Sequence, residues 1–131
     1  MSLERIKTVA EQILNRVPAL RGKSEEATKQ ALVLPMLDAL GFDIWNPAEV
    51  ALEYDADFAI KKLGQKEKVD VAVLASGVPR IYIEVKSVDQ QQLEGHQGQL
   101  ARYFNSTQAV TLGILTNGLE WRFSPTPVIP T

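Results

Sequence analysis

The chain has 131 residues, of which 45% are hydrophobic and 23% charged, and its formal net charge at pH 7 is -2. This length supports one globular domain with one core and excludes two ordinary domains. There is no apolar run long enough to span a membrane and no secretory signal pattern, so we expect a cytoplasmic protein without a membrane partner. Because cysteine is absent, disulfides and thiolate metal sites are excluded. Carboxylates, the single His96 and carbonyls remain as possible ligands, which favours a hard cation that prefers oxygen.

The first 40 residues have the apolar periodicity of two helices. In LERIKTVAEQILNRV, apolar side chains recur at steps of three and four residues, which predicts a helix that stops within residues 18–22. Ser24 is then the expected N-cap of a second helix with an acidic first turn, which runs to Gly41. Pro35 lies inside this second helix and predicts a kink or a break.

From Val50 onward the sequence has the pattern of strands. We predict strands at 50–60, 69–75 and 80–88, a helix at about 90–104, and two short strands around a turn at Asn117-Gly118 within 109–123. The expected order is α-α-β-β-β-α-β-β. It forms a single domain at 1–123, followed by a tail at 124–131.

The hairpin KVDVAVLASGVPRIYIEVKSV carries three charged side chains among residues that otherwise form a buried core. A buried and unpaired charge costs on the order of several kcal/mol, so these residues need a physical explanation. If residues 76–78 form the loop, Asp70 lies directly opposite Glu84, with the two Cβ atoms about 5 Å apart. Lys86 lies on the same face, because side chains alternate with a period of two.

Two neighbouring carboxylates repel each other unless a cation lies between them. Mg²⁺ suits a site with few protein carboxylates, and Mn²⁺ is expected to substitute for it. Such an ion can polarise a phosphodiester and supply hydroxide, while Lys86 stabilises the developing charge or orients the attacking water. The alternative is an ordinary salt bridge between Asp70 and Lys86, with Glu84 in solvent.

A basic segment, KKLGQKEK, precedes this hairpin. Its lysines could contact phosphates or could simply be a solvated hairpin tip. They are Lys61, Lys62, Lys66 and Lys68.

The pattern VDVAV followed by IEVK resembles the D...ExK core of the PD-(D/E)xK phosphodiesterase superfamily. Five blocks, SEEATKQALVLPMLDALGFDIWNPAEVALEY, KVDVAV, YIEVKSV, QLARYF and GILTNGLEWRF, are together similar to the amino-terminal nuclease domain of type I restriction enzyme R subunits. The similarity spans roughly residues 24 to 123. It implies a restriction-endonuclease-like α/β fold, in which a central mixed β-sheet is flanked by helices in three layers.

The resemblance also implies roles for individual residues. Asp70 and Glu84 correspond to the metal ligands of the family and Lys86 to its catalytic lysine. The helix-borne acid of the family, which often helps to hold the metal or its waters, falls on Glu25, with its neighbour Glu26 as the alternative.

Further residues are expected close to this site. Gln99 and Tyr103 match a Q-x-x-x-Y motif that this branch associates with the active site and DNA, and both fall on one polar stripe of the predicted helix. Glu53 could lie near the site from the first strand.

The function that the resemblance implies is that of a Mg²⁺-dependent DNA endonuclease of a restriction system. The chain lacks the G-x-x-x-x-G-K-[ST] loop of a translocase and cannot itself translocate DNA. DNA, a second copy of the chain or other restriction-system subunits are the expected partners. The alternative is a non-catalytic nucleic-acid-binding or assembly module that has retained the nuclease fold.

Overall fold

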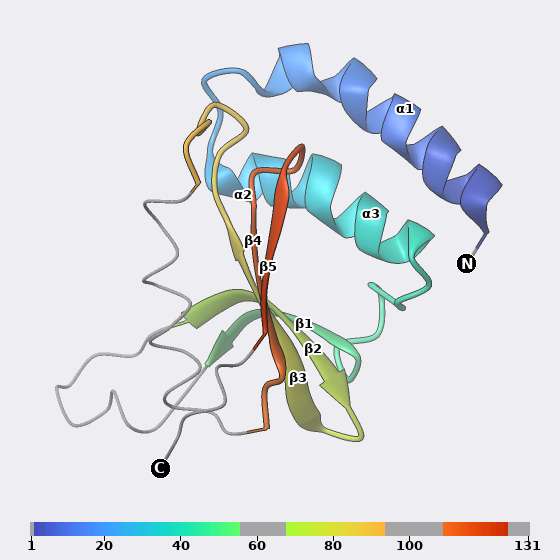
Figure 1. Ribbon diagram of the computed structural model, residues 1–131, viewed down its shortest axis with the longest axis vertical. Helices are drawn as coiled ribbons and strands as arrows, with labels where there is room; N and C mark the ends of the chain where they lie inside the picture. Colours follow the sequence, from blue (N-terminus) through green and yellow to red (C-terminus); the bar gives the residue numbers. More distant parts are fainter. Residues whose placement is uncertain (1, 56–67, 94–108, 126–131) are drawn as a thin grey trace, which may run out of the picture.

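The computed structural model describes residues 2–55, 68–93 and 109–125, and its strands form one five-stranded sheet (Figure 1). The strands are β1 (Val50–Asp55), β2 (Lys68–Ala75), β3 (Val78–Val85), β4 (Leu112–Thr116) and β5 (Trp121–Pro125). They lie in sequence order across the sheet. Strands β3 and β4 are parallel, whereas all other neighbours are antiparallel. The expected α/β fold with a mixed sheet is therefore confirmed.

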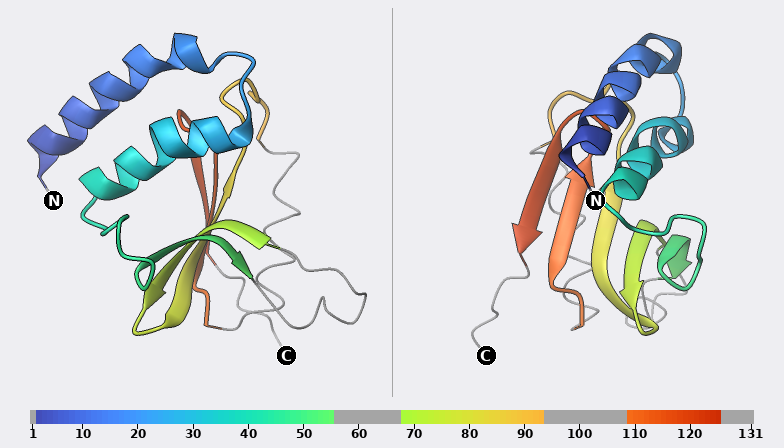
Figure 2. Two further views of the ribbon diagram at one scale, coloured as in Figure 1. Left: turned by 180° about the vertical axis from the view of Figure 1, so that it is seen from behind. Right: turned by 90° about the vertical axis from the view of Figure 1, so that its right-hand side faces the viewer.

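The helices lie together across one face of this sheet (Figure 2). Helix α1 spans Leu3–Leu20, and a second helical rod follows it as α2 (Glu25–Thr28), the π turn η1 (Lys29–Val33) and α3 (Leu34–Ala39). Ser24 is the N-cap of α2, as predicted, since its side chain accepts a hydrogen bond from the amide of Ala27. Among the described residues, none of the helices has the length and apolar character that crossing a membrane requires.

The disturbance predicted at Pro35 takes the form of the π turn, and the helical rod continues through it. The amide of Leu34 donates to the carbonyl of Lys29, five residues earlier, which is the π spacing. Proline has no N–H to donate to the carbonyl of Ala31, four residues earlier. Arg16 of α1 donates its Nη1 to that oxygen instead, at 2.8 Å. An arginine of the neighbouring helix thus satisfies the acceptor that Pro35 leaves open.

The sheet has a hydrophobic cluster on each face. The cluster shared with the helices contains Val33, Leu37, Val50, Val71, Val73, Ile83, Val85 and Ile114. The other cluster contains Val69, Ala72, Tyr82, Leu93, Val110 and Leu115. The sheet is thus buried on both faces at its centre, which explains the nearly continuous apolar runs in β2 and β3.

Several predicted elements fall partly outside the described residues. The first strand is described up to Asp55 and the third predicted helix only over 90–93, where the chain is not helical. The helical layer expected from 94–104 therefore lies outside the described residues. Strand β5 ends at Pro125, two residues beyond the domain boundary that the sequence predicted.

Candidate active site

The β2–β3 hairpin brings two carboxylates together. Val71 opposes Ile83 in the antiparallel register, so the next position along the ladder places Asp70 opposite Glu84, as the sequence predicted. The amide of Val85 donates to Oδ2 of Asp70 at 2.7 Å. This bond fixes the Asp70 carboxylate beside the end of β3.

The reason for this register differs from the expected one. Ala75 pairs with Val78, so the loop consists of residues 76–77 alone, and both of these residues have positive φ angles, as a tight hairpin turn requires. A shift in pairing between Val73 and Leu74 then adds one residue to β3. A shorter loop and this irregularity together give the register that a three-residue loop would have given.

Burial raises the pKa of both carboxylates. Glu84 is buried, with 9% of its side chain exposed, and shares a side-chain hydrogen bond with Asp70. Burial and then the charge of Asp70 raise the pKa of Glu84 to about 8, although Lys86 acts in the opposite direction. Burial also raises the pKa of Asp70, against the opposing effects of the Val85 amide and Lys29. The metal-free pair therefore holds a proton at neutral pH, which a divalent cation would replace.

Lys86 lies beside this pair, as expected from the alternation of side chains. Its Nζ is 3.8 Å from Oε2 of Glu84, and 12% of its side chain is exposed. The alternative that leaves Glu84 in solvent is wrong, because Glu84 is buried. The close packing of β2 and β3 thus provides two acids and one ammonium group at one place.

Strand β1 adds a third acid to the row. Leu52 opposes Val71 and Tyr54 opposes Val69, so Glu53 lies opposite Asp70 on the side of β2 away from Glu84. Glu53 has a φ of 50°, in the left-handed region, where a non-glycine residue costs on the order of 1–2 kcal/mol. Strain of this kind is typical of functional sites, where the surrounding structure maintains it.

Helix α2 supplies the acids predicted from the resemblance. Carboxylate oxygens of Glu26, Glu53 and Asp70 all lie within 4.8 Å of one another, a spacing that can hold a metal ion. Glu25 is exposed, but its charge contributes to the raised pKa values of Asp70 and Glu84. The geometry groups Glu26, which the sequence analysis gave as the alternative to Glu25, with Asp70 and Glu53.

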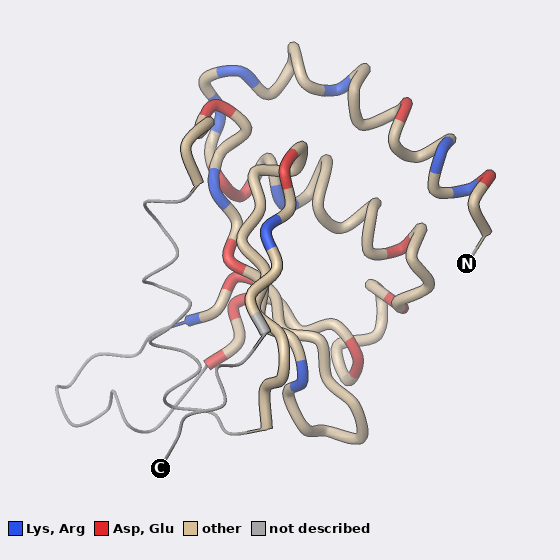
Figure 3. The backbone as a smooth tube through the Cα atoms, in the orientation of Figure 1, with Lys and Arg blue, Asp and Glu red and all other residues tan. Residues whose placement is uncertain are grey.

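The sequence analysis missed Lys29. Its side chain is only 4% exposed, and its Nζ lies 2.8 Å from Oε1 of Glu26 and 3.5 Å from Oε2 of Glu53. Burial lowers the pKa of Lys29, but the contact with Glu26 and the charges of Glu53 and Asp70 outweigh it, so the pKa is raised. The sequence did contain a signal for its burial, because Lys29 lies three residues before the buried Leu32 and thus on the same face of the helix. Several of the acidic positions lie near one another on the strands beside α2 (Figure 3).

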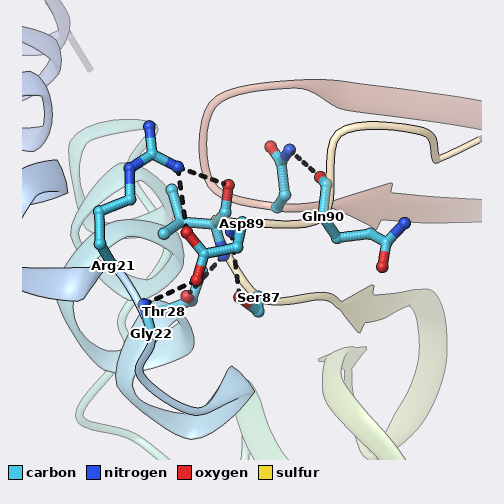
Figure 4. A network of polar contacts seen from close by, with 8 residues as sticks. Arg21, Gly22, Thr28, Ser87, Asp89 and Gln90 are labelled. Carbon is cyan, nitrogen blue, oxygen red and sulfur yellow. Dashed lines mark hydrogen bonds and ion pairs between the residues drawn. The ribbon is translucent and has the colours of Figure 1, made fainter.

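A polar network fixes the start of α2 relative to the end of β3 (Figure 4). The carboxylate of Asp89 accepts bonds from Nη1 of Arg21 at 3.2 Å and from the amide of Gly22 at 2.7 Å. The amide of Val88 donates to Oγ1 of Thr28 at 3.1 Å. These bonds hold the helix-borne acids and the strand-borne residues in one geometry.

Other predicted site residues are not tested by this geometry. Gln99, Tyr103, Lys61, Lys62 and Lys66 lie outside the described residues. Lys68 is exposed and begins β2, opposite Asp55.

The donor set fits a hard divalent cation. It consists of carboxylate oxygens, two of which share a proton in the metal-free state, and Mg²⁺ and Mn²⁺ prefer such oxygens. Lys86 lies beside them, where it can donate to an oxygen of a bound phosphate.

Comparison with known proteins identifies the relationship. The model of the family "Type I restriction enzyme R protein N terminus" matches residues 22–127. Neither the curated proteins nor the solved structures contain a significant match to the chain.

Proposed function

Because the chain belongs to the family of type I restriction enzyme R protein N-terminal domains, we propose that it is a metal-dependent endonuclease that hydrolyses phosphodiester bonds in DNA. The observation that carries this proposal is the buried pair of Asp70 and Glu84, with Lys86 beside it. A protein gains no stability from two adjacent buried acids, so their position is better explained by a cation that they bind.

Asp70 and Glu84 would hold Mg²⁺, or Mn²⁺ in its place, with Glu25 or Glu26 holding the ion or its waters from α2. When bound, the ion supplies a Lewis acid that polarises the phosphodiester and lowers the pKa of a bound water. Glu84 must lose its shared proton before it can act as a full ligand. Metal binding and activity should therefore increase with pH up to about 8.

Lys86 would donate a hydrogen bond to a non-bridging phosphate oxygen, where negative charge increases in the transition state. Its partial burial makes this interaction stronger than it would be in water. Lys86 is thus the residue whose loss should affect catalysis most without removing a metal ligand.

Contacts with DNA would come from the lysines of the basic segment, and Gln99 and Tyr103 would position the strand. A single hydrolytic centre cuts one strand, so cleavage of both strands would require a second copy of the chain or other restriction-system subunits.

Nicking of supercoiled plasmid DNA tests the proposal. The wild type should nick DNA with Mg²⁺, and both EDTA and Lys86→Ala should abolish nicking. Lys7→Ala, which removes the same charge from an exposed position of α1, is the matched control and should retain activity. DNA binding by the wild type without Mg²⁺-dependent nicking would instead support the non-catalytic nucleic-acid-binding module.

A further inference from the structure

We propose that the ammonium group of Lys29 takes the place of a second divalent ion, so that the site binds a single metal ion, held by Asp70 and Glu84. This inference rests on the proposed function, because it concerns the metal content of the same site. It assigns Lys29 the role of a positioning residue that holds Glu26 and Glu53 away from the metal. Of the two acids of α2 named in the proposed function, Glu25 would then be the one that holds the ion or its waters.

The first argument is the position of Lys29. The oxygens of Glu26, Glu53 and Asp70 are close enough together to hold a cation, and Lys29 Nζ already contacts two of these three acids. An ammonium at this point repels a divalent ion that would use the same oxygens. The carboxylates of Glu26 and Glu53 therefore already have a cation beside them, the ammonium group of Lys29.

The second argument is the burial of Lys29. With 4% of its side chain exposed, the ammonium is almost completely removed from water. Nζ lies 2.8 Å from Oε1 of Glu26, within hydrogen-bonding distance, and 3.5 Å from Oε2 of Glu53. Charge attraction to the surrounding acids is thus what compensates its desolvation, and this ties the ammonium to the acid cluster.

The third argument is the charge of the whole site. Four carboxylates, from Glu26, Glu53, Asp70 and Glu84, face the ammonium groups of Lys29 and Lys86. With all of them ionised, two negative charges remain, which one divalent ion neutralises. Glu25 adds a further negative charge, but it is exposed and therefore screened by solvent.

The backbone supports this arrangement on both sides. Lys29 begins the π turn, a feature often found at functional sites, and Glu53 has the left-handed φ described above. Two local departures from regular structure thus occur at the two residues that form this ion pair.

Counting bound Mn²⁺ ions per chain by electron paramagnetic resonance and calorimetry, with the full chain at pH 8, tests the inference. The wild type should bind one ion. Lys29→Met should bind a second ion, or bind the first at least tenfold more tightly, because a repelling charge has been removed. Adding Glu53→Gln to Lys29→Met should remove the second ion. Lys29→Arg, which keeps the charge, and Lys7→Met, which removes an exposed charge, should both keep one ion with unchanged affinity.

Two wild-type ions would overturn this inference and leave the proposed nuclease function intact. Folded Lys29→Met with one ion of unchanged affinity would overturn it as well. If Lys29→Met does not fold, Glu53→Gln alone decides the question: it should retain one ion within tenfold of the wild-type affinity, and loss of the ion would show that Glu53 is a metal ligand. A wild type without any bound ion would overturn both the proposed function and this inference.

Discussion

Replacing Glu84 by glutamine should make the metal-free protein more stable at high pH. The unfolded chain releases the Glu84 proton near the ordinary pKa of 4.5, whereas the folded protein releases it near 8. Between these values unfolding releases a proton, so the free energy of unfolding of the wild type falls as pH rises. At about 1.4 kcal/mol for each pKa unit, this fall amounts to about 3 kcal/mol between pH 5 and pH 8.

Glu84→Gln keeps the size of the side chain and removes this titration. Urea unfolding in EDTA at pH 5 and pH 8 should therefore show the stability of the variant, relative to the wild type, rising by about 3 kcal/mol over this range. Glu11→Gln, an exposed acid of α1, controls for the loss of one carboxylate and should show no such rise. If Glu84 were instead an ionised partner of Lys86 in the metal-free protein, the variant would lose stability at pH 8, and that result would refute the reasoning.

Three further predictions concern the frame of the site and its contact with DNA. Gly118→Ala should destabilise the protein by about 2 kcal/mol or more in urea unfolding, because its φ is 89° and a Cβ would lie 2.5 Å from Cδ1 of Leu32; an unchanged midpoint would contradict this. The Gly22 amide and then Arg21 lower the pKa of Asp89, so Asp89→Asn should be less stable than the wild type at pH 7, with the difference disappearing as pH falls through that lowered pKa. A difference that persisted at pH 2 would count against the network. Changing all four lysines of the basic segment to glutamine should weaken DNA binding equally for every sequence and flatten its salt dependence, whereas unchanged affinity would identify the segment as a solvated tip.

The pairing of Asp70 with Glu84 could be predicted because alternation along a strand and the position of a turn are both local properties of sequence. The true loop is one residue shorter than expected, and the irregular pairing near Leu74 compensates for it. That compensation depends on contacts between strands, which the sequence does not display. The predicted register was therefore correct, but the loop from which it was derived was wrong.

The environment of Lys29 could not be predicted in the same way. Helical spacing placed Lys29 three residues after Glu26 and on the stripe that carries Leu32, so an ion pair on the helix was visible. Its second ion-pair partner, Glu53, is 24 positions later in the chain and has a left-handed backbone conformation. Glutamate seldom adopts that conformation, so nothing in the sequence indicated it.

The most direct test of the central claim is the thermal melting of the wild type and Asp70→Asn, each with and without Mg²⁺. An ion that binds only the folded protein stabilises it by about 2.7 kcal/mol at one hundred times its Kd, so Mg²⁺ should raise the Tm of the wild type. Asp70→Asn should lose most of this response. Its metal-free form should be at least as stable as the wild type, because burial and the charges of Glu53 and Glu25 disfavour the ionised Asp70 carboxylate. A wild type that does not respond to Mg²⁺, together with a clearly destabilised Asp70→Asn, would contradict a metal site at this hairpin.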